Sequence, residues 1–290
     1  MTPAVPCCAY RAYIELTKPR ITWLILMSTA IGYYFGAGSD WTVILLIHTL
    51  IGTGLIASGT AGLNQWYEAQ ADSRMLRTRQ RPIPSGRLTR RQALVFSILL
   101  SIAGYLELTF FVNPLTGGLG LFTLATYLFL YTPLKQRSPH STTVGAIPGA
   151  MPPLIGFAAA AGELTVAAWV LYAILFVWQF PHFYAIAWMY REDYGRAGIR
   201  MLPVVEPEGE STARRILLFL VLLIPVSLMP AWLGMTGRLY LAGAAAMGIY
   251  FLASGFHVMR DRSLLRARGV LMASVVYLPV LYGLMLIDRA

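Results

Sequence analysis

The chain has 290 residues, of which 57% are hydrophobic and only 12% are charged. A soluble domain of ordinary composition carries about 25% charged residues, so this composition excludes the usual soluble classes and indicates a protein of the lipid bilayer. A net charge of +10 is also compatible with binding of nucleic acid. Because the basic residues follow a membrane topology, we expect no nucleic-acid partner.

Nine apolar stretches are each long enough for a helix that crosses a bilayer, which takes about 20 residues. We therefore predict an all-α, multi-pass membrane protein with nine transmembrane helices. Residues 1–290 are expected to form one integral-membrane domain, with residues 1–12 as a flexible N-terminal segment. The predicted spans lie near residues 21–38, 41–63, 92–112, 117–134, 142–161, 165–190, 214–235, 239–259 and 269–287.

An acidic and then a basic cluster follow the second predicted span. Asn64, Glu68 and Asp72 stand at four-residue intervals, which on a helix places three oxygen-bearing side chains on one face. Mg²⁺ prefers oxygen ligands and commonly binds one or two carboxylates together with substrate phosphates. Guanidinium groups bind phosphate oxygens in a forked geometry, and arginines follow at positions 74, 77, 79 and 81. The pattern predicts a magnesium–diphosphate site at the membrane edge; the alternative is a salt-bridged loop without a ligand.

The second of the four long connections, near 135–141, has only seven residues, and it carries Lys135 and Arg137. We expect Lys135 to bind diphosphate oxygens together with Arg77 and Arg81. The span that follows should bend or break, because proline interrupts its backbone hydrogen bonds, and such a break is tolerated where the freed carbonyl groups face protein or a cavity. The prolines concerned are Pro148, Pro152 and Pro153.

The sixth predicted span leads into a second acidic cluster. Glu192 and Asp193 follow this span and precede arginines, which repeats the order of the first cluster. Two such clusters on one membrane face could converge on one diphosphate, since paired ions stabilise a leaving oxygen. Asp193 is the preferred second metal ligand. Adjacent helical residues point about 100° apart, so Glu192 would face elsewhere.

His182 is an ionisable residue within the sixth predicted span, which makes it a candidate functional residue. It could face a haem or handle a proton. The alternative is a hydrogen-bonded interior histidine.

The basic residues gather on one side of the predicted bundle. The N-terminus and the four long connections hold 21 of the 23 lysines and arginines, and the other two are Arg238 and Arg289. The positive-inside rule then places the N-terminus and both acidic clusters on the cytoplasmic side of the cytoplasmic (inner) membrane. The same charge favours contact with anionic lipid or an anionic substrate.

Several segments carry a resemblance to a known family. The run from Asn64 to Pro82 resembles the first aspartate-rich motif of the intramembrane aromatic prenyltransferase superfamily. Three further segments are similar, more narrowly, to the protohaem IX farnesyltransferase (haem O synthase) branch, and the similarity covers about residues 13–285. These segments are Leu16–Ile21, Tyr131–Arg137 leading to Gly145–Gly156, and Asp193–Val204.

The resemblance implies a nine-helix bundle with a central cavity that opens to lipid. It implies transfer of a farnesyl group from farnesyl diphosphate to a vinyl group of haem b, giving haem O and diphosphate, with Mg²⁺ as the cofactor and haem b as a substrate. Hand-off to haem A synthase or to a terminal oxidase is implied in the same way. Where the superfamily often has aspartate in the middle of the first motif, this chain has Glu68, which makes Asp72 the stronger candidate for a direct metal ligand.

The expected site combines these residues on one membrane face. Asp72, Asp193 and Lys135 are the expected catalytic residues, and aromatic faces such as Trp66 could stabilise an allylic cation. The expected metal ligands are Asn64, Glu68, Asp72 and Asp193. The expected substrate-binding residues are Asn64, Arg77, Arg81, Lys135, His182, Tyr184, Tyr190 and Arg191.

Two other functional classes are compatible with parts of the pattern. A relative that prenylates a quinone precursor or a chlorophyll-type ring would share the first acidic motif. An ion-coupled transporter would place its acidic groups near the bilayer midplane. Here they lie at the cytoplasmic ends of spans beside arginines, which suits a charged substrate head better.

Overall fold

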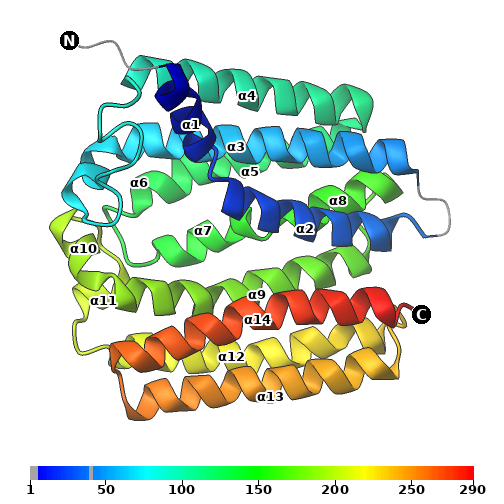
Figure 1. The fold of residues 1–290 in the computed structure, drawn as a ribbon. Helices are drawn as coiled ribbons and strands as arrows, with labels where there is room; N and C mark the ends of the chain where they lie inside the picture. Colours follow the sequence, from blue (N-terminus) through cyan, green and yellow to red (C-terminus); the bar gives the residue numbers. More distant parts are fainter. Residues whose placement is uncertain (1–5, 39–41) are drawn as a thin grey trace.

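The computed structural model describes residues 6–38 and 42–290, where the regular structure is helical apart from one isolated bridge between Thr236 and Arg289. The long helices lie side by side in a bundle (Figure 1). The prediction of an all-α fold is confirmed. In chain order the helices are α1 (Pro6–Leu16), α2 (Pro19–Gly36), α3 (Val43–Arg74), α4 (Arg90–Phe111), α5 (Pro114–Ala125), the π-helical turn η1 (Thr126–Tyr131), α6 (Thr132–Leu134), α7 (Ser141–Gly149), α8 (Met151–Ala161), α9 (Val166–Met189), α10 (Arg191–Arg196), α11 (Leu202–Val205), α12 (Glu210–Trp232), α13 (Arg238–Arg260) and α14 (Leu264–Ile287).

Eight helical stretches in the described residues are long and apolar enough to cross a membrane, one fewer than the nine predicted spans. The remaining predicted span corresponds to α2. Its 18 residues are less apolar than the most apolar 18-residue stretch of each of the eight, and they include Arg20, Tyr33 and Tyr34. It nevertheless packs within the bundle, against α3 and α8.

Helix α1 occupies most of the N-terminal segment predicted to be flexible. Its Ala12 and Leu16 are fully buried in a cluster with Ala69 and Ala93, so the end of this segment is packed against α3 and α4. Residues 1–5 and the short connection predicted near 39–40 lie outside the described residues. The assignment of one domain to the whole chain stays a prediction.

Three helix boundaries shape the site, and two of them differ from the predicted spans. Helix α3 continues to Arg74, well beyond its apolar part, and carries the first acidic cluster on its last three turns. The predicted break at the prolines is confirmed, since α7 ends at Gly149 and α8 begins at Met151. The fourth predicted span is α5 continued by the π-helical turn η1 and α6, an irregularity that apolar length alone did not predict.

Small residues lie where two helices of the bundle approach each other most closely. A side chain at Gly156 of α8 would collide with the backbone at Thr29 of α2, and one at Gly59 of α3 would meet the backbone of α4 at Ser97. Close approach of this kind is what small residues permit in membrane helices. The interior of the bundle is formed by α7, α8 and α9, and nine of the eleven residues of α8 are buried.

Both acidic clusters lie at one end of the bundle. Figure 1 shows the end of α3, the start of α4, α6, α10 and α11 together at the left, whereas the C-terminus lies at the right. The loops that carry most of the basic residues therefore share one end, as the charge pattern predicted.

Candidate active site

The last turns of α3 present the first acidic cluster to the protein interior. Asn64, Glu68 and Asp72 are all buried, with 1%, 6% and 0% of their surface exposed. Their four-residue spacing places them on one helical face, as predicted. A carboxylate is strongly disfavoured in such a place unless a cation or hydrogen-bond donors accompany it.

Each of the two carboxylates has a basic partner from a different loop. Arg81 Nη1 donates to both oxygens of Asp72, at 2.8 and 2.7 Å, and Lys135 Nζ donates to Glu68 Oε1 at 2.8 Å. Lys135 also lies over the ring of Tyr131, 4.5 Å from its centre. Burial by itself would lower the pKa of Lys135, but the Glu68 carboxylate outweighs it and holds that pKa well above its usual value. The structure thus brings Glu68, Asp72, Arg81 and Lys135 together.

Lys18 is a third cation at this centre and was not among the predicted site residues. Its Nζ donates to Asn64 Oδ1 at 3.5 Å, and Asn64 Nδ2 donates to Thr132 Oγ1 at 3.2 Å. Burial lowers the pKa of Lys18 to about 7, and the charges of Arg81 and Lys135 act in the same direction against the opposing carboxylates. Three basic side chains thus face two carboxylates, and an anionic ligand beside Lys18 would favour the charged form of its amine.

The backbone at Lys18 is strained. Its φ of 50° lies in the left-handed region, which residues other than glycine seldom adopt, and Pro19 follows directly. Strain of this kind persists only where surrounding contacts hold it, and it gathers at functional sites. The only sequence signal for Lys18 was its place in the Leu16–Ile21 segment, just as Tyr131 and Thr132 lie in the Tyr131–Arg137 segment.

Asp193 joins the second acidic loop to the first. Its two carboxylate oxygens accept hydrogen bonds from the backbone N–H groups of Leu76 and Arg77, at 3.1 and 3.2 Å, and it pairs with Arg196. Burial would raise the pKa of Asp193, but these donors outweigh it and hold the pKa below its usual value. The two loops therefore meet, as predicted, whereas the role of Asp193 as a metal ligand stays a prediction.

The arginines of the two loops have different surroundings. Arg77 lies over the ring of Tyr190, 4.9 Å from its centre, and donates to the hydroxyl of Tyr194 at 3.4 Å. Arg191 instead stacks on Trp188 at 4.5 Å and donates to the carbonyl group of that residue. Arg77 and Tyr190 thus lie at the junction of the loops, and Arg191 turns back along α9.

Tyr184 and His182, which were predicted to bind substrate, form their hydrogen bonds with α12 and α14. The hydroxyl of the buried Tyr184 accepts a hydrogen bond from Arg215 of α12 at 3.2 Å. His182 Nδ1 lies 2.8 Å from Ser274 Oγ of α14. Neither residue contacts the acidic face of α3 through these bonds. Trp66, predicted as a cation-stabilising ring, lies under Arg90 and packs with the α1 cluster.

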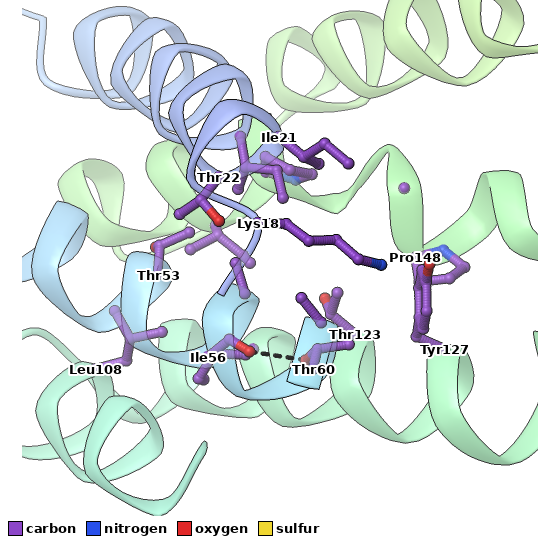
Figure 2. Close-up of a pocket in the computed structure, with 17 residues that line it drawn as sticks. Lys18, Ile21, Thr22, Thr53, Ile56, Thr60, Leu108, Thr123, Tyr127 and Pro148 are labelled. Atoms are coloured by element: carbon purple, nitrogen blue, oxygen red, sulfur yellow. Dashed lines mark hydrogen bonds between the residues drawn. The ribbon is translucent and has the colours of Figure 1, made fainter. Parts of the chain in front are cut away.

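An apolar cavity begins beside the charged centre. It has a volume of about 120 Å³, and its lining comes from Lys18 and from α2, α3, α4, α5, η1, α7 and α8. Figure 2 shows the Lys18 side chain extending toward Pro148 and Tyr127, with Ile56, Thr60 and Leu108 on other parts of the cavity wall. Thr53 and Thr60 lie on α3 two turns apart, so the cavity follows the helix from the charged centre into the membrane. The arrangement places a cationic group at one end of a hydrocarbon-lined space.

The donor atoms at this centre suit a hard divalent cation. The described residues contain no group of three or more His, Cys, Asp and Glu side chains arranged to hold a metal ion. Two carboxylates and the amide of Asn64 nevertheless line one buried helical face, and all three offer oxygen, the ligand that Mg²⁺ prefers. Since Mg²⁺ usually completes its coordination with water and substrate phosphate, such a set fits it.

Comparison with known proteins identifies the family. The model of the UbiA prenyltransferase family matches residues 25–276. The chain belongs to the UbiA prenyltransferase family. It is 66% identical to the protohaem IX farnesyltransferase of Solibacter usitatus, over 96% of this chain and 99% of the relative. It is 44% identical to the protein of the same name from Koribacter versatilis, over 96% and 93%.

Solved structures of the family share the fold. A digeranylgeranylglyceryl phosphate synthase structure superposes with a TM-score of 0.80 at 16% identity, covering 97% of this chain and 98% of that one. A UbiA homologue from Archaeoglobus fulgidus bound to GPP and Mg²⁺ gives a TM-score of 0.66 at 16% identity, covering 94% and 99%. At such identities the likeness shows the helical architecture alone.

Proposed function

We propose that this protein transfers the farnesyl group of farnesyl diphosphate to a vinyl group of haem b, giving haem O and diphosphate. The names of its relatives support the farnesyl group and protohaem IX, which is haem b, as the group transferred and its acceptor. The assignment to named residues rests on two buried ion pairs, Glu68 with Lys135 and Asp72 with Arg81. They share a helical face with Asn64, whose amide oxygen accepts from Lys18, a lining residue of the apolar cavity.

The resting ion pairs suggest how the charged substrate head binds. Arg81 and Lys135 neutralise the two acids, and each would exchange its carboxylate for diphosphate oxygens when substrate arrives. Lys18, at the cavity mouth, would contact the same anion. The freed carboxylates and the amide of Asn64 would then hold Mg²⁺, which when bound neutralises phosphate charge. Its requirement here is part of the proposal.

The chemistry follows from where charge develops. The allylic C–O bond breaks, and the electron pair leaves with the diphosphate, whose growing charge Arg81, Lys135 and Lys18 stabilise. A carbon–carbon bond forms between farnesyl C1 and the haem vinyl group. Water then adds as hydroxyl to the carbocation on the side arm and releases a proton to diphosphate or solvent. The dry cavity would keep water from the allylic cation before the vinyl group reacts.

The proposed function includes a location in the cytoplasmic membrane. The loops that carry the site face the cytoplasm, and the bundle lies in the cytoplasmic membrane, from which the farnesyl chain and haem b reach it through lipid. Hand-off of the product to haem A synthase or a terminal oxidase belongs to this proposal as well.

Reconstitution of the purified protein with its two substrates tests the proposed function. With haem b, farnesyl diphosphate and Mg²⁺, mass spectrometry should find haem b enlarged by one farnesyl group and one hydroxyl group. EDTA should stop product formation, and added Mg²⁺ should restore it. Undiminished product in EDTA would refute the metal requirement, and a prenylated quinone precursor or chlorophyll-type ring as the sole product would refute the substrate.

A substitution in the acidic cluster tests the residue assignment in the same assay. Asp72→Ala should reduce turnover at least about 100-fold, a loss typical of removing a group that stabilises transition-state charge. The exposed Glu192→Gln serves as the control and should leave turnover unchanged. Normal turnover of an Asp72→Ala protein would refute the role of the carboxylate.

A further inference from the structure

His182 stands out among the histidines of the described residues. It lies within α9, on the face turned to α14, and it is partly exposed. His48 is paired with Glu107, and His140 and His257 are exposed. An ionisable group within a membrane span is retained at a cost and is a functional candidate by default.

The hydrogen bonds of Ser274 determine which nitrogen of His182 carries the proton. Ser274 Oγ donates its single hydrogen to the carbonyl group of Leu271 at 2.6 Å. The 2.8 Å contact between Ser274 Oγ and His182 Nδ1 must therefore have the ring N–H as its donor. The neutral imidazole thus carries its proton on Nδ1 and an open lone pair on Nε2.

Ser274 also fixes the orientation of the ring through a second residue. Trp178 Nε1 donates to the Ser274 carbonyl group at 3.0 Å, and the Trp178 ring stacks on His182 with centres 4.8 Å apart and planes 23° apart. The imidazole is therefore held on one side by a hydrogen bond and on one face by an indole. Metal-binding histidines are commonly fixed in this way, by a hydrogen bond from the nitrogen that does not bind the metal.

Within the described part of the chain, Nε2 of His182 has no hydrogen-bond partner, and the surrounding protein does not fully enclose it. An open acceptor in a hydrocarbon environment is unfavourable until a ligand satisfies it. The group that fits must accept a nitrogen lone pair and enter from lipid or from the bundle interior. Of the two proposed substrates, only haem b carries such a group, namely its iron.

We propose that His182 Nε2 binds the iron of haem b and so positions the macrocycle for prenylation, an inference that rests on the proposed function. His182 lies eight residues before Tyr190, which meets Arg77 at the junction of the loops, or about 12 Å away along the helix axis. One iron–nitrogen bond would restrict the macrocycle mainly to rotation about that bond, which lowers the entropic cost of aligning a vinyl group.

Haem titration of the full-length protein in lipid nanodiscs tests this inference by spectroscopy. Wild type should give the absorption and EPR spectra of histidine-ligated ferric haem. His182→Ala should lose that signature and bind haem b at least about tenfold more weakly, the lower end of the loss expected when the support of a metal site is disrupted. Added imidazole should restore the spectrum. Metal-free protoporphyrin IX, which offers no iron, should bind both proteins equally.

Two further variants keep the test decisive. His257→Ala removes an exposed histidine of α13 and should leave the haem spectrum unchanged. Ser274→Ala keeps the histidine but removes the acceptor of its Nδ1 proton, so it should shift the EPR spectrum even if His182→Ala does not fold. An unchanged spectrum in Ser274→Ala, or histidine ligation that persists in His182→Ala while haem b is still farnesylated, would overturn the inference and leave the proposed function standing. A wild-type protein that neither binds nor farnesylates haem b would overturn both.

Discussion

At the scale of single residues, the site depends on buried carboxylates and the cations that accompany them. Glu68 and Asp72 are almost inaccessible, and each is ion-paired with a residue from another segment of the chain. Such a pair adds little to stability as a whole, but removal of one partner leaves an uncompensated buried charge. The cations therefore have two roles, since they form ion pairs with the acids at rest and become available to an anionic substrate.

Removal of the Lys135 amine should expose this dependence. Lys135→Ala leaves Glu68 without its 2.8 Å partner, so we expect the free energy of unfolding to fall by about 3 kcal/mol. Glu68→Gln added to Lys135→Ala should recover much of that loss, because the unpaired charge is then gone. Chemical denaturation in detergent measures both effects. Additive losses in the double variant would contradict coupling between the two side chains.

At the scale of elements, the loop after α3 is held by one carboxylate at the start of α10. Asp193→Asn removes the charge that binds the Leu76 and Arg77 amides and Arg196. We expect faster hydrogen exchange of residues 75–81, measured by mass spectrometry at neutral pH. Glu192→Gln, next to it and exposed, is the matched control and should leave exchange unchanged. Equal exchange in Asp193→Asn and wild type would mean that the loop is held by other contacts.

The pKa of Asp193 gives this contact a definite pH dependence. Because the pKa in the folded protein lies below the usual value, the carboxylate stabilises the fold fully above about pH 4 and loses that contribution as the pH falls through the lower folded value. Asp193→Asn should therefore flatten the decline of stability in acid. Denaturation midpoints measured from neutral to acidic pH would show this, and identical slopes for the two proteins would contradict it.

Helix crossings depend equally on single positions. A methyl group at Gly156 would collide with the α2 backbone at Thr29, whereas one at Gly118 of α5 meets no atom within 4 Å. Gly156→Ala should lower stability by about 2 kcal/mol, a typical cost of overpacking, and Gly118→Ala should be neutral or stabilising. Thermal unfolding in detergent compares the two. Equal melting temperatures would show that α2 and α8 can separate without cost.

The sequence predicted the elements better than their mutual orientation. The spacing of Asn64, Glu68 and Asp72 was sufficient to place them on one face, because helical geometry fixes that relation. The orientation of His182 and Tyr184 was not predictable. Helix α9 is apolar around most of its circumference, so no polar stripe indicates which face meets α12, α14 or the site. Lys18 was missed because its left-handed backbone depends on contacts from other helices.

At the scale of the whole molecule, charge asymmetry predicts the orientation in the membrane. Of 23 basic residues, 21 lie in the N-terminus and the four long connections, and Figure 1 shows those connections at one end of the bundle. Anionic lipid and the positive-inside rule then favour that end in the cytoplasm. The magnesium–diphosphate centre would lie there, and the apolar cavity would extend from it into the bilayer.

Labelling of introduced cysteines tests the orientation. In a protein whose Cys7 and Cys8 are replaced by serine, Gln136→Cys should react with an impermeant maleimide only in inverted vesicles. Glu163→Cys, at the opposite end of the bundle, should react only from the outer side of intact cells that lack an outer-membrane barrier. Both positions are exposed. The reverse pattern would place the acidic loops outside.

The most direct test of farnesyl transfer to haem b is the haem content of cells with and without this protein. Haem extracted from cells that lack it should contain haem b alone. Cells that regain the wild-type chain should contain a second haem, heavier by one farnesyl group and one hydroxyl group, and cells that regain Asp72→Ala should not. Identical haem profiles with and without the wild-type chain, when the protein is present in the membrane, would contradict the proposed function.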